Sequence, residues 1–158
     1  MEKILIILLI FGFLLGTMGE DISLRDFNPE DVEVEENKIT GNQKIQDNKT
    51  GSDDLIKVYK ESISGNATIN LTSDKGDIYL LFQEKITGNV KINVKSNRGD
   101  IHLKFEEAIL GNPSINLEAP RGKVIFYNEV DTVGNASISI NAENVEYTSG
   151  KPEAMENY

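Results

Sequence analysis

Two acidic residues at equivalent positions are the first candidates for chemistry in this chain. Asp77 and Asp100 each follow a glycine, and Lys123 occupies the same place after a further interval of equal length. Paired carboxylates can act as general acid and base, or they can hold calcium. However, the calcium-binding nonapeptide of glycine and aspartate is absent, and Lys123 interrupts the series. We therefore interpret these residues as part of turns.

The single histidine is the other residue that could do chemistry. His102 has no cysteine or second histidine to join it, so a zinc site would need carboxylates for all of its other ligands. Its place in an alternating segment also points it outward, where no Ser-His-Asp triad can be argued. The sequence predicts no enzyme, no metal site and no cofactor.

An internal repeat sets the spacing of these residues. A Gly-Asn pair recurs at nearly constant intervals, starting at Gly41, Gly65, Gly88, Gly111 and Gly134. A constant period in this range is typical of repeat architectures. Each pair precedes a segment that alternates apolar and polar residues, and a glycine-containing turn leads to a second such segment. Each repeat is therefore predicted to be strand, tight turn, strand, tight turn.

Like residues recur at like positions, and this pattern favours one fold class. Ile69 is matched by Ile92, Ile115 and Ile138 in later copies, and Leu80 by Leu103. If equivalent residues of successive repeats stack directly on one another, the same side chain is favoured at each equivalent position. We expect an all-β parallel β-solenoid (β-helix) of about five 23-residue coils. An antiparallel meander or sandwich built from hairpin repeats is the alternative, because the same turns suit hairpins.

The segments outside the repeat domain (residues 38–148) differ from it. Residues 1–19 have the features of a signal peptide, with one cation and twelve apolar residues before small residues at the cleavage position. An uncleaved anchor and a buried core helix are the alternatives. Residues 20–37 form an acidic leader that reads as a solvated tether, with room for a short edge strand at Val32 and Val34. Residues 149–158 are predicted to be a frayed C-terminal tail.

The composition excludes several classes of function. The chain has 158 residues with 16 basic and 26 acidic side chains, and its formal net charge is -10. Such a charge argues against nucleic acid, because basic residues must replace the counterions of phosphates. Without cysteine there is no disulfide framework and no thiolate metal site. The acidic balance suits a soluble surface protein.

The two outward-facing surfaces of the repeats differ in character. On the first strand the outward positions are polar and include the column Asn70, Asn93 and Asn116. On the second strand they are apolar and aromatic, which suggests a contact surface. The partner-binding candidates are Tyr79, Leu81, His102, Ile125 and Tyr127. The alternative is that the acidic leader or the tail covers this surface.

Four sequences match the acceptor pattern for N-glycosylation. They place candidate glycans on Asn48, Asn66, Asn70 and Asn135. The prediction depends on export and on exposure of these side chains.

The repeat rhythm resembles a family of envelope proteins. Ser73-Asp74-Lys75-Gly76-Asp77-Ile78 is matched by Ser96-Asn97-Arg98-Gly99-Asp100-Ile101, and both alternate with Gly-Asn-x-x-Ile. This pattern resembles the adhesin and head-GIN-type β-solenoid repeat domains of prokaryotic cell-envelope proteins, over residues 38–148. The resemblance implies a β-solenoid at the cell surface with an adhesive role, and it carries over no functional residue.

These observations together predict an exported repeat protein, extracellular or at the cell surface, with a structural or adhesive role. Its expected partner is a component of the cell envelope, a glycan or another copy of itself, bound through one outer strand face. Membrane contact is expected only through an uncleaved N-terminal segment. A carbohydrate-binding module with Tyr79 and Tyr127 as stacking platforms is one alternative, and a polysaccharide-active solenoid enzyme is the other.

Overall fold

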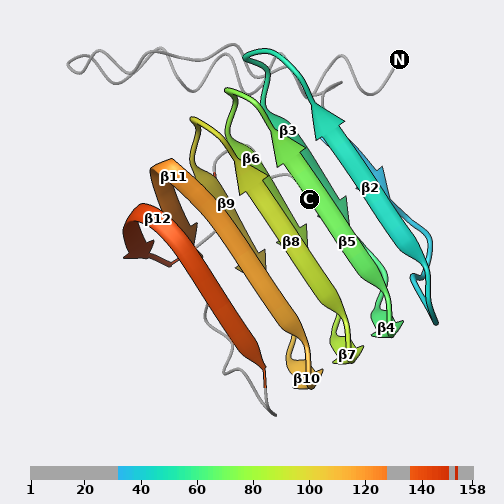
Figure 1. Cartoon of the computed structure of the whole chain (residues 1–158). Coiled ribbons are helices and arrows are strands. Elements are labelled where there is room, and N and C mark those ends of the chain that lie inside the picture. Colours follow the sequence, from blue (N-terminus) through green and yellow to red (C-terminus); the bar gives the residue numbers. More distant parts are fainter. Residues whose placement is uncertain (1–31, 128–135, 150–151, 153–158) are drawn as a thin grey trace, which may run out of the picture.

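The chain winds into a parallel β-solenoid in which each coil corresponds to one repeat of the sequence (Figure 1). The computed structural model describes residues 32–127, 136–149 and 152, and these residues form strands and turns without a helix. Every strand pair is parallel and joins one coil to the next. The predicted solenoid is therefore confirmed, and the antiparallel alternative is wrong.

Three faces surround the interior of the solenoid. Face one is the large face toward the viewer in Figure 1. It contains β2 (Lys44–Lys49), β5 (Thr68–Ser73), β8 (Lys91–Ser96) and the first parts of β11 (Ser114–Phe126) and β12 (Ser137–Tyr147). In this register Ile69 pairs with Ile92, Ile92 with Ile115 and Ile115 with Ile138. The predicted isoleucine column is confirmed rung by rung.

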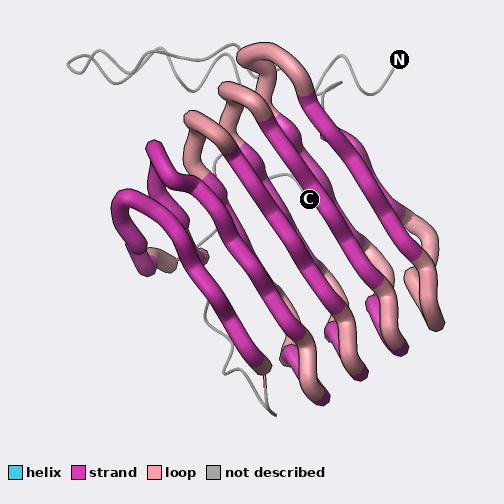
Figure 2. The backbone as a smooth tube through the Cα atoms, viewed as in Figure 1, coloured by secondary structure: helices cyan, strands magenta, loops and turns pink. Residues whose placement is uncertain are grey.

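Face two lies behind face one and is joined to it by the long strands. It contains β1 (Val32–Glu35), β3 (Leu55–Tyr59), β6 (Ile78–Phe82), β9 (Ile101–Phe105) and the last parts of β11 and β12. β11 and β12 continue around the corner, so the two faces make one nine-stranded sheet. In the coils before β11, loops take this corner instead (Figure 2).

A third, narrow face was not predicted from the sequence. It consists of β4 (Ile63–Gly65), β7 (Ile86–Gly88) and β10 (Ile109–Gly111), paired in parallel as a separate sheet. The prediction of two strands per repeat is thus wrong, because the segments that end at Gly65, Gly88 and Gly111 are also strands. Each of these strands buries its isoleucine, and Gly88 must be a glycine because φ is +91° and a Cβ would lie 2.7 Å from the Gly65 oxygen.

The interior is filled by columns of identical or similar side chains. The isoleucine column of face one faces a second aliphatic column on face two that contains Leu80 and Leu103, and all of these except Ile138 at the end of the solenoid are buried. Beside them the rings of Tyr59, Phe82 and Phe105 stack in parallel, with centroids 4.9 and 5.1 Å apart. Because the backbone spacing between strands is about 4.8 Å, an in-register sheet brings equivalent rings to stacking distance.

Part of the acidic leader belongs to the fold. Val32–Glu35 forms β1 and pairs in parallel with β3, with Val32 opposite Ile56 and Val34 opposite Val58. The predicted edge strand is confirmed, and the interpretation of this segment as a solvated tether is wrong for Val32–Glu35. These valines pack against a second apolar cluster, formed by Ile56, Val58 and Leu81 outside the interior of the solenoid.

One buried group in the interior lacks a hydrogen bond. The hydroxyl of Tyr59 is inaccessible to solvent and has no partner, although the ring stacks on Phe82. Burial, followed by the negative charges of Asp47, Glu35 and Glu33, raises its pKa far above the usual value for tyrosine. A buried donor without an acceptor costs about 1 to 3 kcal/mol.

Replacement of Tyr59 by phenylalanine is therefore expected to stabilise the protein by about 1 kcal/mol, since the stacked ring remains and the unpaired hydroxyl is lost. Urea-induced unfolding followed by circular dichroism measures the change. Tyr147→Phe is the control, because the Tyr147 side chain is 77% exposed and its hydroxyl is expected to contribute almost nothing. Equal or lower stability of Tyr59→Phe would contradict the expectation.

Candidate functional site

The carboxylates singled out from the sequence form a ladder along the corner between faces one and two. The Asp77 amide donates to Asp54 Oδ1 (2.8 Å), the Asp100 amide to Asp77 Oδ1 (2.9 Å) and the Lys123 amide to Asp100 Oδ1 (2.8 Å). Each carboxylate thus satisfies a backbone N–H of the next coil. The ladder fits the interpretation of these residues as turn chemistry, and Asp54 is an additional rung that sequence reasoning missed.

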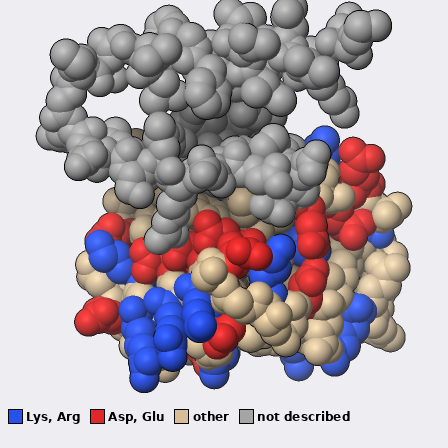
Figure 3. Space-filling view, turned by 90° about the horizontal axis from the view of Figure 1, so that it is seen from above, with Lys and Arg blue, Asp and Glu red and all other residues tan. Residues whose placement is uncertain are grey.

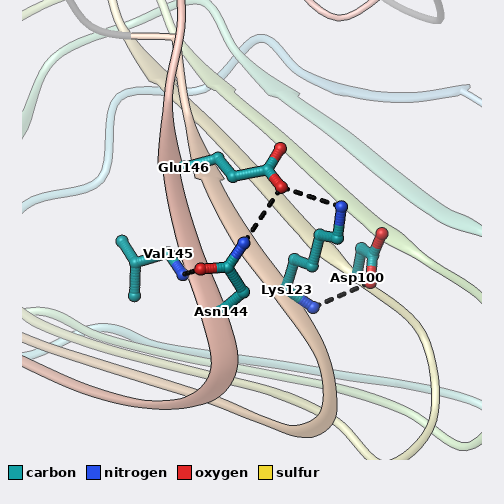
Figure 4. Close-up of polar contacts among 5 residues, drawn as sticks. All are labelled: Asp100, Lys123, Asn144, Val145 and Glu146. Carbon is teal, nitrogen blue, oxygen red and sulfur yellow. Dashed lines mark hydrogen bonds and ion pairs between the residues drawn. The ribbon is translucent and has the colours of Figure 1, made fainter.

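Lys123 closes this ladder at the C-terminal side (Figure 4). Its Nζ lies 2.8 Å from Glu146 Oε1, and the same oxygen accepts a hydrogen bond from Asn144 Nδ2 at 3.1 Å. The hydrogen bond from Lys123 holds the pKa of Glu146 below its usual range. The lysine that interrupts the aspartate series is therefore half of an exposed ion pair between the last two coils.

Two buried serines support the same corner from inside. Ser73 Oγ donates to the Gly76 oxygen at 2.9 Å, and Ser96 Oγ donates to that same oxygen at 3.1 Å. Ser96 Oγ also accepts from the Gly99 amide at 2.9 Å. Both side chains are completely buried, so their hydroxyls replace solvent for the turn. Their spacing of one repeat was the available signal, but serine at the end of a strand was not recognised as a buried residue.

The corner does not present a single sign of charge. Seen from above, acidic and basic side chains interleave with uncharged ones, and a group of basic side chains gathers at one edge (Figure 3). Among the described residues, no group of three or more acidic, histidine or cysteine side chains could hold a metal ion.

The outer side of face one carries a column of amides. Asn93 Nδ2 donates to Asn70 Oδ1 at 2.8 Å, whereas Asn116 Nδ2 donates to Glu118 Oε1 at 3.3 Å. Glu118 also pairs with Lys95 across the strands at 3.2 Å. A shallow groove of about 210 Å³ runs over this array, lined by Asn70, Leu71, Thr72, Asn93, Val94, Lys95, Asn116 and Glu118. The groove presents amide, hydroxyl, ammonium and carboxylate groups at intervals of one coil.

The outer side of face two carries a ladder of rings. Tyr79 stacks on His102 with centroids 4.3 Å apart, and His102 stacks on Tyr127 at 5.8 Å. His102 Nδ1 and the Tyr127 hydroxyl are also hydrogen-bonded at 3.0 Å. Burial raises the pKa of Tyr127, and the charges of Glu146 and Asp100 add to the effect, so the hydroxyl keeps its proton at neutral pH.

The five partner-binding candidates are not equally accessible. Tyr79, His102, Ile125 and Tyr127 are half-buried, and the pairing of β6, β9 and β11 brings Tyr79, His102 and Ile125 into one row as expected. Leu81 is 0% exposed, so the prediction that it is exposed is wrong. It packs with Ile56 and Val58 in the cluster that β1 extends. For that part of the surface, the alternative that the acidic leader covers it is correct, because Val32 and Val34 pack against the cluster.

The N-terminal end of the interior is closed by charged residues. Asp47 occupies the rung below Leu71, where the interior column is otherwise aliphatic, and it forms an ion pair with Lys57. Lys57 also pairs with Glu33 of β1. Burial works against the charge of Asp47, but the hydrogen bond and charge of Lys57 outweigh it and lower the pKa of Asp47. Burial likewise opposes the charge of Lys57, and the two carboxylates outweigh it and raise its pKa.

The candidate glycosylation sites have different surroundings. Asn48 and Asn66 are exposed, whereas Asn70 is half-buried and accepts the hydrogen bond from Asn93. Asn66 belongs to an amide ladder in which its Nδ2 donates to Asn42 at 3.2 Å and its Oδ1 accepts from Asn89 at 3.2 Å. Asn135 lies outside the described residues, so its sequon stays a prediction.

The predicted signal peptide, residues 1–19, also lies outside the described residues, as do residues 20–31 of the acidic leader. In the described part, the chain forms no helix long and apolar enough to cross a membrane. Of the predicted tail, only Ser149 and Pro152 are described, and Pro152 is buried.

Comparisons with known proteins give no relative for this solenoid. No protein-family model, curated protein or solved structure matches the chain. The resemblance to adhesin and head-GIN-type domains thus stays a prediction from the residues, and any function must be argued from the surfaces themselves.

Proposed function

We propose that this protein is an exported, non-catalytic module with a structural or adhesive role at the cell surface, and that it binds a glycan across the outer side of face one. The observation that carries the proposal is the amide column of Asn70, Asn93 and Asn116 beside the groove. Amides can both donate hydrogen bonds to the hydroxyls of a sugar and accept them, and carboxylates can accept them. Their repetition on neighbouring strands suits a ligand that is itself a repeating polymer.

Face one supports this role better than the ring ladder of face two. Around the groove, Lys95 is exposed and the amides and Glu118 are only partly buried, so polar groups remain within reach of a ligand. On face two, Leu81 and Val58 are buried in the cluster against which Val32 and Val34 pack, so part of its outer side is already covered. Each amide contact with a sugar is weak alone, so useful affinity would come from several coils acting on one chain.

Calorimetric titration with soluble glycan polymers, together with an assay for newly formed reducing ends, tests the proposal. We expect saturable heat without turnover, and loss of that heat in Asn93→Ala, which removes the central rung of the column. Lys60→Ala is the matched control, because Lys60 is exposed and lies away from the groove on the turn after β3. Turnover would favour the polysaccharide-active enzyme, and binding lost in Tyr127→Ser but kept in Asn93→Ala would move the site to face two.

The proposed export is tested by mass spectrometry of the intact protein isolated from the cells that naturally produce it. The intact mass is expected to lack residues 1–19. Retention of these residues in a membrane fraction would favour the uncleaved anchor instead.

A further inference from the structure

The two ends of the solenoid differ in what they offer a partner. At the N-terminal end, the interior terminates in the ion pairs of Lys57 with Asp47 and Glu33. A depression at the same end is lined by Glu35, Asn37, Lys38, Ile39, Gln43, Lys44 and Ile45. Inward-pointing charges of this kind prevent one sheet edge from pairing with another, because pairing would strip them of water.

At the C-terminal end, the positions of β12 that are in register with buried residues of β11 contain no charged side chain. Three residues in register with buried side chains of β11 are exposed there: Ile138 is 40% exposed, Val145 37% and Tyr147 77%. Ile140 and Ala142 are only partly buried. The interior columns of the solenoid therefore end in apolar side chains that meet solvent.

The backbone of β12 is also open on one side. β12 pairs in parallel with β11 over ten residue pairs, and no other described strand pairs with it. The Ser137 amide donates to the oxygen of Pro113, the residue before β11, at 2.9 Å. Because successive residues of a strand bond to opposite sides, the amides and carbonyls of Ile138 and Ile140 point away from β11. They form a row of unpaired groups of the type that accepts another strand.

We propose that this edge binds a second copy of the chain, with the two C-terminal ends facing each other about a twofold axis and their β12 strands paired antiparallel. The inference is independent of the glycan site on face one. In such an arrangement, the isoleucine column that starts at Ile45 and ends at Ile138 continues into the column of the partner. A twofold interface uses the same patch on both copies, so the assembly closes as a dimer.

The distribution of charged residues favours this twofold dimer over a head-to-tail stack of copies. From Ser137 to Ala142 the edge strand contains no charged residue, so two copies of this stretch meet without repulsion. Head-to-tail stacking would instead bury the charged N-terminal end of one copy against the apolar end of the next. It would also leave both outer edges open, and the product would be a series of growing oligomers rather than a dimer.

The test compares substitutions at the two ends of a single column. Sedimentation velocity of the full chain over a range of concentrations is expected to show a monomer–dimer equilibrium. Ile138→Lys, which places an inward charge at the open edge, is expected to raise the dissociation constant by about tenfold or more. Ile45→Lys is the matched control at the opposite end and is expected to leave it within about twofold. All chains carry the same N-terminal apolar run, so it cannot account for a difference between them.

Other outcomes of this experiment overturn the proposal. Equal weakening by both substitutions, or oligomers beyond the dimer, would indicate head-to-tail stacking. Association that neither substitution changes would place the contact elsewhere, and a wild-type chain that stays monomeric would exclude the dimer. Circular dichroism of each variant shows whether it is folded, and Val145→Lys repeats the test at a second inward position of β12.

A measurement on the unmodified chain covers the case in which these variants do not fold. Hydrogen exchange at the amides of Ile138 and Ile140 is expected to slow as the protein concentration rises, since these groups become paired in the dimer. Exchange that does not depend on concentration would contradict the proposal. Because each copy carries a net charge of -10, added salt is also expected to tighten association, and weakening by salt would contradict an apolar interface.

Discussion

Replacement of Gly99 by alanine is expected to destabilise the solenoid by about 3 kcal/mol or more. A Cβ at this position would lie 2.3 Å from the Gly76 oxygen and 2.6 Å from Asp77 Oδ1. The Gly76 oxygen cannot easily move, because Ser73 and Ser96 both donate to it from inside the turn. The added methyl group must therefore push neighbouring coils apart and break the corner at its centre.

Gly51→Ala is the control for this substitution. Gly51 lies at the same corner in the first coil, has φ of +95° and has open space where a Cβ would be placed. It is expected to cost about 1 to 2 kcal/mol through backbone strain alone. Urea denaturation of both variants separates the two causes. A smaller loss for Gly99→Ala than for Gly51→Ala would show that the coils are not in close contact at this corner.

Replacement of Lys57 by methionine is expected to destabilise the N-terminal end by about 2 kcal/mol at neutral pH. Methionine has a similar length but leaves Asp47 and Glu33 without the cation that they share. Breaking a fully buried ion pair costs about 3 to 5 kcal/mol, and we reduce this value because the Asp47 side chain is one-third exposed. Lys60→Met, which removes an exposed pair with Glu36, is the control and is expected to cost less than about 0.5 kcal/mol.

The difference between wild type and Lys57→Met is expected to depend on pH in a defined window. The lowered pKa of Asp47 means that its contribution to stability is present above its unfolded pKa of about 4 and is lost as the pH falls through the folded value. The raised pKa of Lys57 means that its contribution is complete below its unfolded pKa of about 10.4 and is lost as the pH rises through the folded value. Thermal unfolding from pH 3 to pH 8 measures the difference, which should vanish at the acidic limit. A constant difference across this range would exclude the ion pairs as its cause.

Much of the fold could be predicted because the same pattern of apolar residues recurs at equivalent positions of several repeats. A single alternating segment does not distinguish a solenoid from a hairpin, whereas isoleucine at four equivalent positions indicates direct stacking. The third strand was missed for a local reason. Each such strand, for example Ile86–Gly88, is too short to show alternation, although an isoleucine two residues before the glycine of the first four Gly-Asn pairs was a periodic signal.

The candidate site was less predictable because accessibility is a property of neighbours in space. Leu81 points outward by strand parity, as expected, yet it is buried in a second apolar cluster beside Val58. The pattern of residues within one strand cannot indicate what lies over its outer side. The difference between the two ends of the interior could not be predicted for the same reason. Asp47 is visible in the sequence as a charged residue in an aliphatic column, but its ion pair with Lys57 depends on the register of two separate strands.

The parallel pairing of each coil with the coils before and after it has a consequence for the history of this chain. No described strand pairs with one that lies more than one coil away, so a gene duplication that inserted one further repeat unit in the middle would lengthen the solenoid by about 4.8 Å and leave both ends unchanged. The number of coils can therefore drift between lineages while the specialised first and last units are retained.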